Sequence, residues 1–97
     1  MTNTVAEGAW VVTTAHQGVF FGYSAEPGEG PIVTLARARM CIHWPNEMRG
    51  VLGLASQGPV KGSRVTPAVP SLTLRDVTAI MLCTLEAAAQ WEREPWA

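Results

Sequence analysis

Runs of apolar and β-branched residues indicate that the first part of this chain forms a pair of strands. The segment AWVVTT at 9–14 is followed by HQG and then by a second such run, GVFFGY at 18–23. Two strands joined by a short turn are typical of a β-hairpin. The tract SAEPGEGP at 24–31 combines proline, glycine and glutamate, which predicts an exposed loop or a long hairpin turn.

A third strand is predicted for IVTLARARMCIHW at 32–44. Regular alternation places one set of residues on the face that we assign to the core: Ala36, Ala38, Met40, Ile42 and Trp44. The opposite face then carries the other set: Leu35, Arg37, Arg39, Cys41 and His43. Pro45 ends the strand, because proline lacks the amide donor that a β-ladder requires.

Glycine and proline interrupt the chain after this strand. Residues 47–57 fit either a short helix or a further strand, because Gly50 and Gly53 weaken a helix. Residues 56–71, SQGPVKGSRVTPAVPS, contain too much glycine and proline for a long regular element. We therefore expect a long Gly/Pro-rich loop there, and loops of this length in compact domains are commonly functional or mobile.

The last part of the chain returns to strand character and then favours a helix. Residues 72–83, LTLRDVTAIMLC, predict strand structure with a bend at Asp76. Thr84 is a suitable N-cap for a helix over 85–93, and Glu86 in its first turn suits the helix dipole. The expected apolar side of the helix consists of Leu85, Ala88, Ala89 and Trp91.

Together these elements predict a mainly β (α+β) fold, a small antiparallel β-barrel or strongly bent sheet with one C-terminal helix. The 97 residues supply one hydrophobic core, so we expect a single domain over 1–97 with a flexible N-terminus at 1–7. Small domains bury a limited fraction of their surface, and an unpaired strand edge invites further pairing. We therefore expect a homo-oligomer.

Composition and charge narrow the function classes. Hydrophobic residues make up 47% of the chain and charged residues 15%, which excludes a disordered chain and favours apolar surface that meets a partner. The net charge of −1 is the sum of −3 for residues 1–30, +5 for residues 31–75 and −3 for residues 76–97. Near-neutrality therefore excludes diffuse polyanion binding, whereas a local anion site in the middle segment stays open.

Several kinds of site lack sequence support. No apolar run reaches the about 18 residues that span a bilayer, so we expect a cytoplasmic protein with no membrane partner. In a reducing compartment Cys41 and Cys83 are small core residues. His16 and His43 lie far apart without a metal-binding motif, so neither a metal nor a cofactor is expected.

The candidate ligand-binding residues lie in the basic middle segment. In QGPVKGSR at 57–64 the order of glycine and lysine does not match a P-loop, but Lys61 and Arg64 can bind an anion beside flexible glycines. Arg37 and Arg39 share a predicted strand face and can bind a planar anion or a nucleic-acid backbone. The full candidate set is Arg37, Arg39, His43, Arg49, Lys61, Ser63 and Arg64.

Each of these groups also has a structural interpretation. The loop charges can be solvated residues that maintain solubility. The strand arginines can pair with glutamates from the acidic ends of the chain, an interpretation that we favour slightly. Catalysis has little support, because neither a set of Ser63, His16 and Asp76 nor a Cys41 and His43 pair comes with a recognisable nucleophile motif. We expect no enzyme.

Four segments carry a resemblance to a known family: GVFFGY, VTLARARMCIHW, RGVLGLASQGPVKGSR and VTPAVPSLTLRDVTAIM. With these segments the chain resembles, over about residues 8–96, a small uncharacterised family encoded by tailed bacteriophages and prophages. The outline of a glycine-containing strand, a turn and VTLARARM, with VTAIM later, is similar to Sm-like and SH3-like small barrels. The first resemblance implies a phage origin and a site of action in the host cytoplasm.

The leading functional hypothesis is a non-enzymatic, oligomeric, phage-type protein that binds an anionic small molecule or an acidic host protein. The phage resemblance implies that it inhibits host defence, by sequestering a nucleotide signal or by occluding a protein. One alternative is a small barrel that binds RNA or single-stranded nucleic acid through Arg37, Arg39 and exposed aromatic residues. Another is a structural component of the virion or of its assembly.

Overall fold

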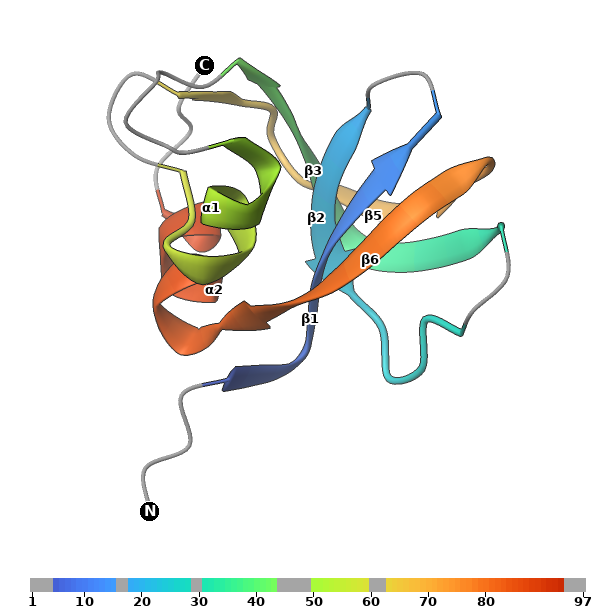
Figure 1. The fold of residues 1–97 in the computed structure, drawn as a ribbon, viewed down its shortest axis with the longest axis horizontal. Coiled ribbons are helices and arrows are strands. Elements are labelled where there is room, and N and C mark those ends of the chain that lie inside the picture. The colour runs from blue at the N-terminus through green and yellow to red at the C-terminus, as the bar shows by residue number, and fades with distance from the viewer. Residues whose placement is uncertain (1–4, 16–17, 29–30, 44–49, 60–62, 94–97) are drawn as a thin grey trace.

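The computed structural model describes residues 5–15, 18–28, 31–43, 50–59 and 63–93, and these residues form six strands and two helices. The elements are β1 (Val5–Thr14), β2 (Val19–Tyr23), β3 (Val33–His43), α1 (Gly50–Ser56), β4 (Arg64–Val65), β5 (Val69–Leu74), β6 (Val77–Thr84) and α2 (Leu85–Glu92). The strands make one bent antiparallel sheet, and the two helices lie together on one side of it (Figure 1). The predicted mainly β fold with a C-terminal helix is confirmed, with a sheet that is not closed into a barrel.

The strand order explains why the sheet is bent. The path runs β4, β3, β2, β1, β6, and β5 also pairs with β3. The consecutive strands β5 and β6 therefore pair with β3 and β1, and only two residues, Arg75 and Asp76, connect them. A flat sheet would hold these edges apart, so the sheet must curve. Asp76 makes the corner in the left-handed region at φ +56°, which confirms the predicted bend.

A β-bulge in β3 changes which residues face the core. Phe21 pairs with Arg39, but Tyr23 pairs with Ala36, so β3 has one residue more than its partner in this interval, and Arg37 has φ +49°. An extra residue reverses the alternation beyond it. The predicted core face of β3 was therefore wrong in part: Leu35, Arg39 and Cys41 are buried, whereas Ala36 and Ile42 are exposed. Trp44 lies outside the described residues.

Both faces of the sheet are covered. On the helix side, the side chains of Phe21 and Trp91 stack with ring centroids 5.0 Å apart, and Val11 lies in the same cluster. Val12 points the other way, into a second cluster with Leu35 and other residues of β3 and β5. The two consecutive valines are both fully buried, because β1 lies between two apolar layers.

The two helices are fastened to each other by side-chain hydrogen bonds. The Thr84 hydroxyl accepts from Ala87 N (3.0 Å), which confirms the predicted N-cap, and donates to Ser56 O (2.7 Å) at the end of α1. The Trp91 indole donates to Leu54 O at 3.0 Å. Gly58 follows α1 with φ +82°, and a Cβ there would stand 2.7 Å from Ala87 O. These contacts hold α1 against α2.

Several boundaries differ from the sequence-based expectation. The ambiguous segment 47–57 contains the helix α1, and the expected loop at 56–71 contains β4 and the first residues of β5. Residues 5–7 of the expected flexible N-terminus belong to β1. On α2 the buried residues are Ala87, Ala88 and Trp91, whereas Leu85 and Ala89 are exposed. Within the described parts of the chain, no helix is long and apolar enough to cross a membrane.

Candidate functional site

Arg39 is buried, with 8% of its surface exposed, and its guanidinium binds the chain itself. Nε donates to Thr66 O at 2.7 Å, and Nη1 donates to Trp91 O and, at 3.1 Å, to Arg93 O. The last carbonyls of a helix have no partner within the helix, and a cation is favourable at this end of the helix dipole. Arg39 therefore holds the C-terminal end of α2 against β3. Burial lowers its pKa, and the Glu92 carboxylate partly opposes this effect.

Arg37 lies at the same end of α2 but on the surface. Its Nη1 is 3.5 Å from Glu92 Oε1, and its guanidinium lies over the Tyr23 ring, 4.2 Å from the centroid. Burial, followed by a hydrogen bond with the Glu92 carboxylate, raises the pKa of Tyr23. Arg37 thus pairs with a glutamate from an acidic end of the chain, as the structural interpretation of the strand arginines expects.

Three of the remaining candidates, His43, Ser63 and Arg64, lie at the other end of β3. His43 ends this strand and pairs in register with Arg64 of β4, and both residues are exposed. Neither side chain has a hydrogen bond or an ion pair with another described residue. Ser63 is buried, and its hydroxyl has no hydrogen-bond partner among the described residues. Arg49 and Lys61 lie outside the described residues. The structure therefore divides the described candidates between the two ends of β3.

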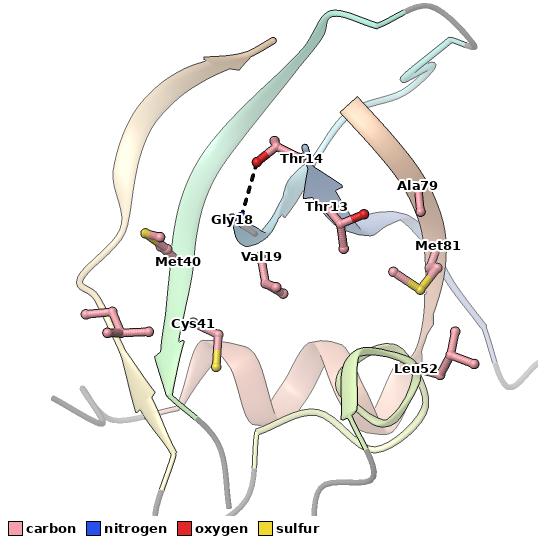
Figure 2. Close-up of a pocket in the computed structure, with 10 residues that line it drawn as sticks. Thr13, Thr14, Gly18, Val19, Met40, Cys41, Leu52, Ala79 and Met81 are labelled. Carbon is pink, nitrogen blue, oxygen red and sulfur yellow. Dashed lines mark hydrogen bonds between the residues drawn. The ribbon is translucent and has the colours of Figure 1, made fainter. Parts of the chain in front are cut away.

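A hollow of about 660 Å³ lies along the end of β3, where the lining residue Ile42 directly precedes His43. Neither His43 nor Arg64 belongs to its lining. Figure 2 shows it between β3 on one side and β6 on the other, with the end of the β1 and β2 hairpin behind it and the helices below. Its lining consists of Thr13, Thr14, Gly18, Val19, Met40, Cys41, Ile42, Leu52, Ala79 and Met81. Ile42 and Leu52 are 58% and 73% exposed, which is unusual for large apolar side chains. The hollow can therefore accept apolar groups.

The polar groups of this lining are already engaged. Thr13 Oγ1 and Thr78 Oγ1 share a hydrogen bond of 2.8 Å, and Thr14 Oγ1 accepts from Gly18 N at 3.2 Å. Cys41 Sγ donates to His43 O at 3.4 Å, and burial raises the pKa of this thiol to about 11. The thiol is therefore protonated near neutral pH and is a poor nucleophile.

Metal ligands do not converge in the described parts of the chain, since no group of three or more histidine, cysteine or acidic side chains lies close together there.

The sequence alone did not predict the hollow. Its only sequence signal is the presence of apolar residues in segments of β1, β2, β3, α1 and β6, and such residues are equally expected in a core. Cys41 was assigned to the core and lines the hollow as well.

Comparison with known protein families decides the relationship of the chain. A model of a domain of unknown function, DUF6948, matches residues 8–91. The chain belongs to this family. No curated protein and no solved structure matched it. The matched DUF6948 region contains every residue that lines the hollow, together with Arg37, Arg39, His43 and Arg64.

Proposed function

We propose that this DUF6948 protein is a non-catalytic binding protein whose ligand site is the hollow between β3 and β6. The observation that carries the proposal is the mostly apolar lining of a 660 Å³ hollow, which includes Met40, Cys41 and Ile42, the three residues of β3 that precede His43. Sites for small molecules are concave and mostly apolar, with a few polar groups that fix the ligand's orientation. The ligand we propose is an anion with an apolar or planar part.

Binding fits this site better than catalysis. Among its described lining residues only Cys41 is ionisable, and its raised pKa keeps the thiol protonated at neutral pH. General acid or base chemistry requires a group whose pKa lies near the working pH. An anion is instead recognised by positive charge and N–H donors, which we propose that Arg64 and His43 supply from the end of β3, next to the lining residue Ile42.

The resemblance to phage and prophage proteins supports a more specific role. A nucleotide combines a planar base with a phosphate, so its base would enter the hollow while its phosphate contacts His43 and Arg64. We propose that the protein acts in the host cytoplasm and inhibits host defence by sequestering a nucleotide signal. The alternative of single-strand nucleic-acid binding depended on Arg37 and Arg39, and the structure commits the Arg39 guanidinium to backbone carbonyls.

Calorimetry with cyclic dinucleotides and ADP-ribose tests this proposal. Leu52→Glu places a carboxylate in the lining of the hollow, and Arg64→Ala removes the positive charge that pairs in register with His43. We expect each variant to weaken binding by at least about 10-fold, equivalent to about 1.4 kcal/mol. The matched controls, Ile32→Glu and Arg75→Ala, alter exposed residues outside the hollow and leave the affinity unchanged. The absence of binding heat with every nucleotide, or equal binding by Leu52→Glu, would contradict the proposal.

A further inference from the structure

Strand β6 leaves one edge of the sheet open. Within the described sheet it pairs with β1 alone. At its start Val77 N donates to Pro31 O (3.0 Å), and the outer edge beyond this residue has no backbone partner among the described segments. The sequence VTAIMLCT contains no charge, proline or glycine. Natural proteins usually block such an edge with charges or proline, because an open edge pairs with other chains.

On the opposite side of the sheet β3 pairs with both β4 and β5. β4 has only two residues, and β5 is protected in this way. Its sequence VPSLTL carries Pro70, and Pro67 stands just before it. A proline has no amide hydrogen to offer an added strand. The two open sides of the sheet therefore differ, and the difference singles out β6 as the edge that can accept another strand.

Two hollows flank β6, one on each face of the sheet. Met81 and Ala79 pair with Val11 and Thr13 and line the first hollow. A second hollow of about 630 Å³ is lined by Trp10, Ile80 and Thr78 together with residues 25–28. Trp10 and Ile80 belong to the opposite face, because they pack against the second apolar cluster. Ala79 lines both hollows, so only a methyl side chain separates them at this point of the edge.

We propose that a second copy of this chain adds its own β6 to this edge, antiparallel, about a two-fold axis at Ile80. This register places the partner's Met81 opposite Ala79 and the partner's Leu82 opposite Thr78. A large side chain then stands beside a small one on each face of the sheet. In an antiparallel pair, directly opposite side chains lie on the same face, so the partner's Met81 lies beside Ala79 on the face that lines the first hollow.

A second copy fits this edge for reasons of charge and symmetry. Self-pairing brings no like charges together, because β6 carries none. A two-fold axis lets one uncharged apolar patch serve as both partners, which is the commonest arrangement of soluble oligomers. Pairing also covers Leu82, which is 40% exposed in the single chain. Because each ligand site then contains the partner's Met81, this last part of the inference rests on the proposed function, whereas the pairing itself does not.

Sedimentation of the full chain, without ligand, tests the pairing. We expect the native chain to be a dimer at about 10 μM and higher, and Leu82→Lys and Ala79→Lys to sediment as folded monomers. Val69→Lys is the matched control, because it adds the same charge to the exposed surface of the proline-protected strand β5 and should leave the dimer intact. Circular dichroism and thermal melting show whether each variant is folded.

The register has a separate test. With the axis at Ile80, the two copies of this residue face each other, so Ile80→Cys should form an intermolecular disulfide on mild oxidation. Thr73→Cys on β5 should not cross-link. A native chain that is monomeric at every concentration, a dimer that Leu82→Lys does not disrupt, or an Ile80→Cys dimer without cross-link would each overturn the proposal. A monomer that binds an unrelated extended peptide at this edge would also overturn it.

The shared ligand site is tested with Leu82→Lys, because Leu82 does not line the first hollow. If the partner's Met81 completes the site, the monomeric variant binds the nucleotide at least about 10-fold more weakly than the native dimer. Unchanged affinity in the monomer would remove the shared site while leaving the proposed function intact. If Leu52→Glu abolishes nucleotide binding but monomer and dimer bind the nucleotide equally well, the shared site is ruled out and the proposed function is not.

Discussion

The two ends of β3 use positive charge in different ways. At the bulge, Arg37 and Arg39 meet the C-terminal end of α2, where Glu92 and backbone carbonyls of the same chain accept their hydrogen bonds. At the far end, His43 and Arg64 pair in register next to the hollow-lining residue Ile42, and their side chains have no acceptor among the described residues. The same residue types therefore hold a helix of the same chain at one end and lie exposed, without a described acceptor, at the other. The segments that pack against each end of β3 therefore decide whether its cations are engaged within the chain or exposed.

Replacement of Arg39 should have the largest effect on this comparison. Arg39→Leu leaves the carbonyls of Thr66, Trp91 and Arg93 without their buried donor. We expect the free energy of unfolding to fall by about 3 kcal/mol, since hydrogen bonds to charged groups and buried unpaired acceptors each cost this order of energy. Urea denaturation measures the change, with exposed Arg75→Leu as the control. A loss below about 1 kcal/mol would show that Arg39 does not hold α2.

Alkaline pH should lower the free energy of unfolding, by less than the Arg39 substitution does and by more than substitution of an exposed arginine. Burial raises the pKa of Cys41 to about 11 and of Cys83 to about 12, and Tyr23 also has a raised pKa. Each group is an acid that stays neutral in the folded chain, so its stabilising contribution is complete below its unfolded pKa and is lost as pH rises toward the folded value. We therefore expect stability to decrease from about pH 9 upward.

Denaturant midpoints measured from pH 7 to pH 11 check this expectation. Cys83→Ala and Tyr23→Phe should each make the alkaline decline shallower, because each removes one group that titrates. Tyr23→Phe shows how much of the alkaline loss of stability comes from the end of β3 near α2. Cys41→Ala shows how much comes from the hollow. A stability that is flat or rises above pH 9 would contradict the assigned directions of these pKa shifts.

The smallest effects on stability should come from the exposed cations. Arg37→Ala removes a surface ion pair with Glu92 and a contact with the Tyr23 ring, which together contribute about 0.5–1 kcal/mol. Arg64→Ala removes a side chain without a described partner and should change the unfolding free energy by less than about 0.5 kcal/mol. Chemical denaturation of the two variants compares them directly. An equal loss in both would erase the difference between the ends of β3.

Much of the fold could be predicted from local sequence patterns. The hairpin, the strand at residues 33–43, the bend at Asp76 and the Thr84 N-cap depend on residues that are close in the chain, and their predictions are confirmed. The core face of β3 could not be predicted from such local patterns. One extra residue near Arg37 reverses the alternation, and nothing in ARAR marks where the bulge will form.

For the candidate site, the sequence predicted which residue types are concentrated in one segment, but not which of them are exposed or what surrounds them. The basic middle segment contains His43 and Arg64, which remain exposed, as well as Arg39, which is buried. The partners that separate these roles are Trp91 and Arg93, more than fifty positions from Arg39 along the chain. Apolar residues such as Leu52 and Ala79 gave no sign that they border a hollow, because an apolar residue in a core has the same sequence signature.

By itself, the sequence determined the strands, the cap of α2 and the concentration of positive charge in the middle of the chain, because these depend on propensity, on neighbouring residues and on composition. Only the tertiary structure decided that Arg39 holds α2, that a hollow opens along the end of β3, and that β6 has an open edge among the described strands. Each of these features depends on which distant segments pack together. That packing follows from the curvature of the whole sheet and from a single bulge.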